Sequence, residues 1–292
     1  MPTFCALAAV VALAGMPGHD KAFWQAIVNA KFEVPAGETA AGLASELLTH
    51  LGSPDPELRD ELAATILTSW IYEKKLLTPD ELRPLVVTLR QNLRRGIGTQ
   101  DTDATLLRSF SALTLSIVAA RENVTPFMTA GEYGQLLDSA LAYLHDERDT
   151  RGYDARRGWI HTAAHTADLL KFLARHPLLP PTGQARILAA LLIKNREAGA
   201  PFAQGEDERM ARVAISVVRR GDFDRAAFTA WLDAAKETAS FPKPPTVDQL
   251  RAQQNVRHLL AALWTALSVD ERPSEGADFA RSALRERLKT LY

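Results

Sequence analysis

Hydrophobic and polar residues do not alternate along this chain over any window of strand length, so the period-two signature of a β-sheet is absent. Leucine and alanine dominate instead. The pattern predicts an all-α protein of about twelve helices. We expect them near residues 20–30, 39–51, 56–75, 79–93, 103–121, 130–146, 158–175, 183–198, 206–219, 224–238, 246–268 and 274–290.

Capping residues mark several helix boundaries. Thr78 precedes a proline and has Glu81 three positions later, and Thr129 stands in the same relation to Glu132, which is the spacing of a capping box. Gly52 and Pro54 end one helix, and Pro56 begins the next. These residues define helix starts independently of hydrophobicity.

The predicted linkers are short, which favours antiparallel helix pairs packed side by side, as in an irregular α-solenoid or HEAT-like array. No exact repeat is visible. The strongest internal break is the proline cluster at residues 241–245, because clustered prolines exclude helix. Two helices after this break are too few to hold a core alone, so residues 15–292 are predicted to form a single domain with a C-terminal helical hairpin.

Composition narrows the function classes. The chain has 292 residues, of which 47% are hydrophobic, and its 34 basic and 35 acidic residues nearly cancel. We therefore expect no nucleic-acid partner, since a global positive field is missing. No apolar run reaches the roughly 18 residues that a membrane span needs. Cys5 is the only cysteine, which excludes an intrachain disulfide or a cysteine-based zinc site. Nucleotide-binding, zinc-protease and serine-hydrolase motifs are absent.

Residues 1–14 are uncharged and apolar, and Ala12-Leu13-Ala14 before Gly15 fits the cleavage pattern of a secretory signal. Against this, no Lys or Arg precedes the apolar stretch. We expect a periplasmic or secreted protein, and a cytoplasmic one with an apolar first helix is the alternative.

The segment richest in candidate catalytic or metal-binding side chains runs from residue 151 to residue 168. On a helix, His161, His165 and Asp168 project within about 60° of one another. Two imidazoles at positions i and i+4 can bind one zinc ion, and a carboxylate one turn later can ligate the metal or orient an imidazole. The spacing therefore permits a divalent metal such as zinc.

Three interpretations of this face stay open. Its flanking residues are mostly apolar, so the row can be a buried hydrogen-bond network that only fixes packing. It can be the site of a metal-dependent hydrolase, which needs a further ligand such as Glu147 or Asp149 and an open position for water. It can also line a metal-free pocket for a peptide or small molecule.

Other charged residues extend the candidate set. Glu147, Asp149 and Arg151 alternate in charge at a helix junction, where they supply site residues or an ion-pair clamp. Arg108 lies inside an apolar helix and is either a snorkelling surface side chain or the partner of a buried acid. Glu208 lies in the first turn of a predicted helix, where the dipole favours acids regardless of function.

The dipeptide His145-Asp146 invites comparison with metal-dependent phosphohydrolases that carry a histidine-aspartate pair. Such a site also needs a histidine upstream and an aspartate downstream, and the local patterns support neither His50 nor Asp168 in these roles.

Five blocks in this order resemble a bacterial family catalogued as domain of unknown function 2785. They are residues 52–60, 108–113, 143–153, 158–168 and 206–209. The resemblance covers roughly residues 23–233 and leaves residues 236–292 outside.

This resemblance implies an all-helical fold and carries no assigned activity. It groups Arg108, Asp149, Arg151, His165 and Glu208 with the rest of the histidine face as one set, which suggests that they meet in space. We expect first a helical binding protein with a polar pocket around the two histidines, and second a metal-dependent hydrolase that uses the same residues.

Overall fold

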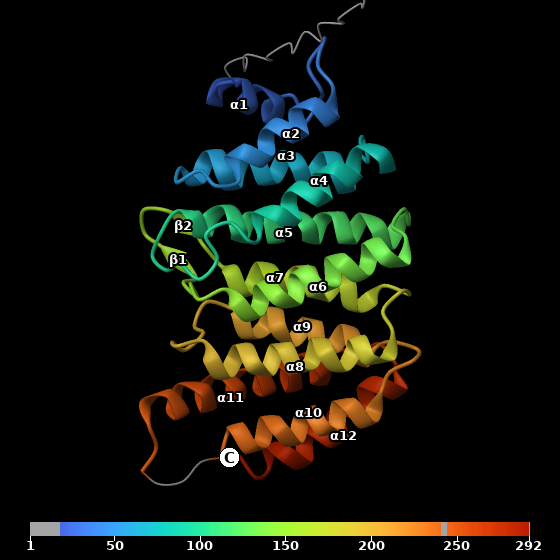
Figure 1. The fold of residues 1–292 in the computed structure, drawn as a ribbon. Coiled ribbons are helices and arrows are strands. Elements are labelled where there is room, and N and C mark those ends of the chain that lie inside the picture. The colour runs from blue at the N-terminus through green and yellow to red at the C-terminus, as the bar shows by residue number, and fades with distance from the viewer. Residues whose placement is uncertain (1–17, 241–243, 292) are drawn as a thin grey trace, which may run out of the picture.

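The computed structural model describes residues 18–240 and 244–291, and almost all regular structure there is helical (Figure 1). The α-helices of this part of the chain are α1 (Lys21–Asn29), α2 (Ala40–His50), α3 (Thr65–Thr68), α4 (Pro79–Asn92), α5 (Ala104–Val124), α6 (Ala130–Asp146), α7 (Thr162–Arg175), α8 (Pro181–Glu197), α9 (Glu206–Val218), α10 (Arg225–Thr238), α11 (Val247–Val269) and α12 (Glu275–Leu288). The all-α prediction is confirmed. The expected export signal at residues 1–14 lies outside the described residues.

The capping signals act as expected. Thr78 and Glu81 form a complete capping box at the start of α4, and Thr129 and Glu132 form another at the start of α6. In each box the threonine hydroxyl accepts from the glutamate N–H and the glutamate carboxylate accepts from the threonine N–H. The free N–H groups of these first turns are thereby satisfied.

The predicted helix at residues 56–75 is one continuous helix with an unusual winding. Two π-helical segments, η1 (Glu57–Ala64) and η2 (Ser69–Glu73), flank the short α3. A π-helix has a wider turn than an α-helix, and such turns recur at functional sites. We call residues 57–73 the wide helix.

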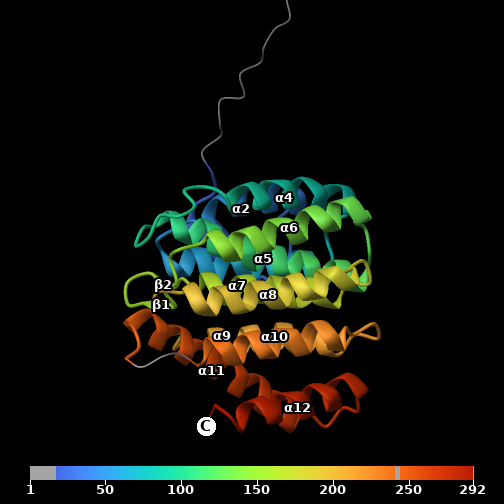
Figure 2. The same ribbon diagram turned by 60° about the horizontal axis from the view of Figure 1, so that its bottom comes forward.

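The helices form two stacked rows (Figures 1 and 2). In one row the wide helix packs on α5, α5 on α7, α7 on α9 and α9 on α11; in the other, α6 packs on α8, α8 on α10 and α10 on α12. Buried apolar side chains from Trp24 to Leu291 form one cluster between the elements. The more specific α-solenoid remains a prediction.

The C-terminal hairpin of α11 and α12 packs onto the preceding helices, because α11 contacts both α8 and α9. The predicted proline break lies between α10 and α11, and its residues 241–243 lie outside the described part. No helix of the described residues is long and apolar enough to cross a membrane.

The described residues contain one small antiparallel hairpin, made of β1 (Tyr153–Asp154) and β2 (Gly158–Trp159). It stands immediately before α7, on one side of the helical stack and level with α5 and α7 (Figure 1). This hairpin determines where the candidate site lies.

Candidate functional site

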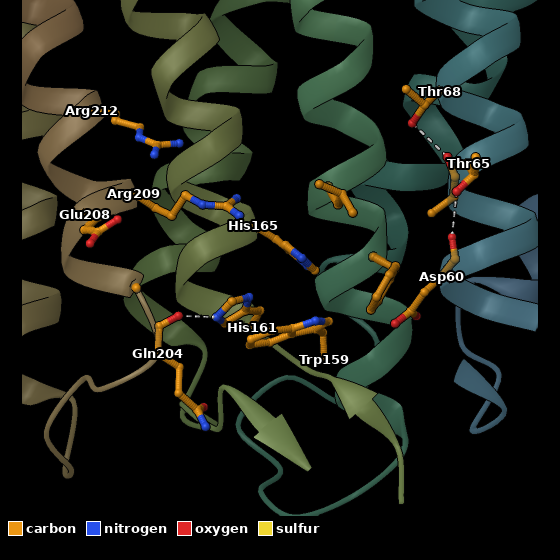
Figure 3. A pocket seen from close by; sticks show the side chains of 14 residues that line it. Asp60, Thr65, Thr68, Trp159, His161, His165, Gln204, Glu208, Arg209 and Arg212 are labelled. Carbon is orange, nitrogen blue, oxygen red and sulfur yellow. Dashed lines mark hydrogen bonds between the residues drawn. The ribbon is translucent and has the colours of Figure 1, made fainter. Parts of the chain in front are cut away.

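A cavity of about 600 Å³ opens where α5, α7 and α9 meet the wide helix and the end of the β1–β2 hairpin. Figure 3 shows side chains from these elements directed toward one space. Pockets for small organic molecules have volumes of this order and combine apolar walls with a few polar groups. Phe110, Leu113 and Trp159 supply apolar surface here, and His161 and His165 supply polar atoms. We call this cavity the histidine pocket.

The prediction of one helix from residue 158 to residue 175 is wrong at its start. Residues 158 and 159 belong to β2, and α7 begins only at Thr162. His161 is the residue before α7 and has left-handed backbone angles, φ 50° and ψ 37°. Its N–H donates to the carbonyl groups of Arg151 and Gly152, which holds the turn from β2 into α7. Such strained backbone is concentrated at ligand and active sites.

The second histidine, His165, is a neutral ring with a fixed tautomer. The Ser109 hydroxyl donates its single proton to the carbonyl oxygen of Ile160. It must therefore accept from His165 Nδ1, which lies 2.9 Å away. Burial, followed by the neighbouring charge that His161 can carry, lowers the pKa of His165 to about 3. Its Nε2 therefore presents a lone pair, and this atom has no partner among the described residues.

His161 presents its other nitrogen. Its Nε2 lies 3.0 Å from the carbonyl oxygen of Gln204, and because a carbonyl only accepts, Nε2 carries the proton. Burial lowers the pKa of His161, so the ring is predominantly neutral and Nδ1 holds the lone pair. The ring stacks on Trp159 at 4.3 Å and meets His165 edge-on at 5.8 Å. Two imidazole acceptors thus lie side by side in the pocket.

Asp168 does not join them. Its carboxylate is paired with Arg209 and, at 3.0 Å, with Lys171, and it does not line the histidine pocket. Among residues 18–240 and 244–291, no group of three or more His, Cys, Asp or Glu side chains is arranged to hold a metal ion. The structure therefore does not assemble the predicted zinc ligand set of His161, His165 and Asp168.

The wide helix forms an acceptor-rich wall of the pocket. The hydroxyl groups of Thr65 and Thr68 donate to backbone carbonyl groups of their own helix. Their oxygens can therefore only accept in any further hydrogen bond. Asp60 adds a carboxyl group, and burial raises its pKa to about 6 against the opposing charge of Arg59. Arg59 is fully buried and ties this wall to the hairpin through the Arg157 and Trp159 carbonyl groups.

The opposite wall is formed by α9. Arg209 is engaged with Asp168, whereas the side chains of Glu208 and Arg212 have no hydrogen bond or ion pair to any other described residue and line the pocket. The predicted position of Glu208 in the first turn of this helix is correct, since α9 begins at Glu206. The side chain lines the histidine pocket and also a neighbouring cavity between α9 and α11.

The remaining predicted residues form a separate buried cluster. Arg108 is fully buried and binds Glu147 in a two-pronged pair, with Nε 2.6 Å from Oε2 and a terminal nitrogen 3.1 Å from Oε1. Arg108 is therefore the partner of a buried acid. Next to this pair, Arg151 lies 2.6 Å from Asp149, whose carboxylate also accepts from the Thr105 hydroxyl.

The predicted set therefore does not line a single pocket. None of Arg108, Glu147, Asp149 and Arg151 lines the histidine pocket. They act as the clamp between α5, α6 and the hairpin, and the Thr162 hydroxyl at the start of α7 donates to the Asp149 carbonyl. The clamp supports the start of the helix that carries His165.

His145 does not line the histidine pocket. It is half exposed on the last turn of α6, where its Nδ1 lies 2.7 Å from the neighbouring Asp146.

Asp60, Ser109 and Arg212 were not predicted as site residues. Asp60 and Ser109 lie inside two of the five blocks that resemble the family, residues 52–60 and 108–113, and this was the one signal that could have identified them. The sequence carries no such signal for Arg212.

The model of a family described as "Protein of unknown function (DUF2785)" matches residues 93–265, more than half of the chain. The chain belongs to this family. The DUF2785 match begins after the first block of the predicted resemblance, residues 52–60, and extends beyond its predicted end. It includes both histidines and the α9 wall, whereas Asp60 lies outside it. No curated protein and no solved structure matches the chain.

Proposed function

We propose that this protein binds a small organic molecule that carries several O–H or N–H donors, such as a monosaccharide or an amino sugar, in the histidine pocket. The observation that carries the proposal is the pair of neutral imidazoles whose tautomers leave one lone pair each without a partner. Both nitrogens line an open pocket, where a ligand donor can replace water as their hydrogen-bond partner.

The surroundings support the same ligand chemistry. Thr65 and Thr68 offer acceptor oxygens on one wall, and Glu208 adds a carboxylate on the other. Trp159 and Phe110 provide flat apolar surface for the body of the ligand. Arg212 adds N–H donors to the same wall, so the pocket suits a molecule whose hydroxyl or amino groups both donate and accept, as those of a sugar do.

The experiment is a titration of the purified protein with glucose, glucosamine, N-acetylglucosamine and inositol, followed by calorimetry and tryptophan fluorescence. Permethylated glucose serves as the matched probe without donors. We expect at least one donor-rich compound to bind with saturation and the permethylated compound to fail. If none of the donor-rich compounds binds, the proposal is wrong.

Two variants connect binding to the named acceptors. His165→Phe keeps a ring and removes both nitrogens, and it should weaken binding by about tenfold or more, since one unmatched hydrogen bond costs about 1–3 kcal/mol. Thr68→Val should weaken it less. Thr88→Val is the matched control, because the Thr88 hydroxyl makes the same bond to a preceding carbonyl on α4, away from the pocket. Equal affinity in His165→Phe and in the unchanged protein would contradict the assignment.

A further inference from the structure

A second cavity, of about 470 Å³, lies where α7 and α9 end and the chain passes from α11 to α12. Arginines dominate its lining: Arg175, Arg219, Arg220 and Arg272. The histidine pocket lies at the starts of α7 and α9, so the two cavities are separated by the length of these helices, roughly 20 Å. We call the second cavity the arginine cavity.

One of its arginines is explained by the fold. The guanidinium of Arg220 donates to the carbonyl groups of Ala174, His176 and Leu179 and pairs with Asp222 at 2.7 Å. Cations commonly satisfy the last carbonyl groups of a helix in this way. Arg220 therefore caps α7, and its charge is balanced.

Only one carboxylate pairs with the other three arginines, and it pairs with two of them. Arg219 and Arg272 both pair with Asp270, the latter at 2.9 Å. Arg175 donates from Nε to the Ser216 hydroxyl at 3.0 Å and has no acidic partner among the described residues. Three positive charges thus face one negative charge. The chain as a whole has a net charge of −1, so this excess comes from placement and not from composition.

The fold maintains this excess at a cost. Burial and the nearby charge of Arg272 lower the pKa of Arg175. Nε of Arg219 is buried and has no hydrogen-bond partner. An anion in the cavity offsets the repulsion and accepts from the guanidinium N–H groups that line it.

We infer that the arginine cavity binds the phosphate or diphosphate group of a small organic molecule. Guanidinium groups match phosphate oxygens in pairs, and the excess of two charges matches a dianion. An adjoining cavity of about 350 Å³ shares Arg219 and Arg220 and is lined by Phe223, which gives room for the organic part of the ligand. The concave shape fits a soluble ester better than a membrane surface.

The test uses inorganic pyrophosphate as the probe, in calorimetry with the full-length protein at constant ionic strength. We expect saturable binding that Arg175→Gln and Arg272→Gln each weaken by about tenfold or more, as for the loss of a hydrogen bond to a charged group. Arg175→Lys keeps the charge and loses the paired donors. Its affinity for pyrophosphate should therefore lie between that of the unchanged protein and that of Arg175→Gln. Arg186→Gln is the matched control, since this exposed arginine pairs with Asp138 on another surface.

The other outcomes decide against the inference. No saturable heat with pyrophosphate overturns it, and so does an Arg186→Gln affinity as low as that of Arg175→Gln. Citrate binding as tightly as pyrophosphate overturns the assignment to phosphate. Binding to phosphatidic acid vesicles without binding to pyrophosphate assigns the cavity to a lipid headgroup and overturns the soluble ligand. Thermal unfolding of each variant, which we expect to remain cooperative, verifies that loss of binding is not loss of the fold.

Discussion

The hydroxyl of Ser109 lies 2.9 Å from Nδ1 of His165 and donates its own proton to the Ile160 carbonyl. This pair connects α5 to α7 and determines which nitrogen of the buried ring carries a proton. A side chain that does not line the histidine pocket therefore sets the hydrogen-bonding character of one that does.

Replacing Ser109 by alanine should release the His165 tautomer. We expect ¹⁵N NMR of the imidazole to change from one neutral tautomer to a mixture, and stability to fall by about 0.5–1.5 kcal/mol for the lost hydrogen bond. Ser111→Ala is the control on the same helix, because the Ser111 hydroxyl is buried without a partner and its removal should cost nothing. An unchanged His165 spectrum in Ser109→Ala would show that the hydroxyl does not fix the ring.

Acid should destabilise the protein through His165. The folded pKa of about 3 lies below the ordinary value of 6.5, so between these values the unfolded chain binds the extra proton. Stability therefore falls as pH falls from 6.5 toward 3, by about 1.4 kcal/mol for each pH unit. The pKa of Asp60, raised to about 6, gives the opposite slope from pH 6 down to its ordinary value near 4.

Comparison with His165→Phe isolates this contribution, because Asp60 is common to both proteins and its slope cancels in the difference. Urea unfolding at several pH values between 4 and 8 should show the unchanged protein losing stability relative to the variant below pH 6.5. A constant difference over this range would mean that His165 does not have a depressed pKa.

Glu147→Gln should be severely destabilising. It leaves the Arg108 guanidinium buried opposite a neutral group, and breaking a buried pair in this way typically costs about 3–5 kcal/mol. The matched control is Asp138→Asn, which breaks the exposed pair with Arg186 and should cost less than about 1 kcal/mol. Urea midpoints of the two variants measure both values, and similar losses would show that the buried pair has no special weight.

Gly158→Ala should disturb the hairpin that carries Trp159. Gly158 has a φ of +70°, and a Cβ atom there would lie 3.1 Å from Pro56 Cβ. Left-handed backbone costs an L-residue about 1–2 kcal/mol. Gly37→Ala has the same backbone cost at φ +88° without any close atom, so it is the control. We expect a larger loss of stability and a shifted tryptophan emission in Gly158→Ala, and equal effects would rule out the contact with Pro56.

Local signals predicted those parts of the fold whose causes are local. The capping pairs Thr78 with Glu81 and Thr129 with Glu132 lie within one turn, so the sequence determines them directly. The prediction of where α7 starts failed because His161 takes a left-handed conformation. Its N–H is held by the carbonyl groups of Arg151 and Gly152, nine or ten residues earlier in the chain. Helical spacing contains no trace of that long-range bond.

The same distinction separates what the sequence by itself determined about the site from what the tertiary structure decided. The sequence identified His161 and His165 as a pair and Arg108 and Glu208 as charged residues of interest. Only the packing of helices decided that Asp168 pairs with Arg209, that Glu147 pairs with Arg108, and that Ser109 fixes the His165 tautomer. Side-chain partners come from segments 39 to 56 residues apart in most of these contacts, and the choice among competing partners depends on burial and geometry that exist only in the folded chain.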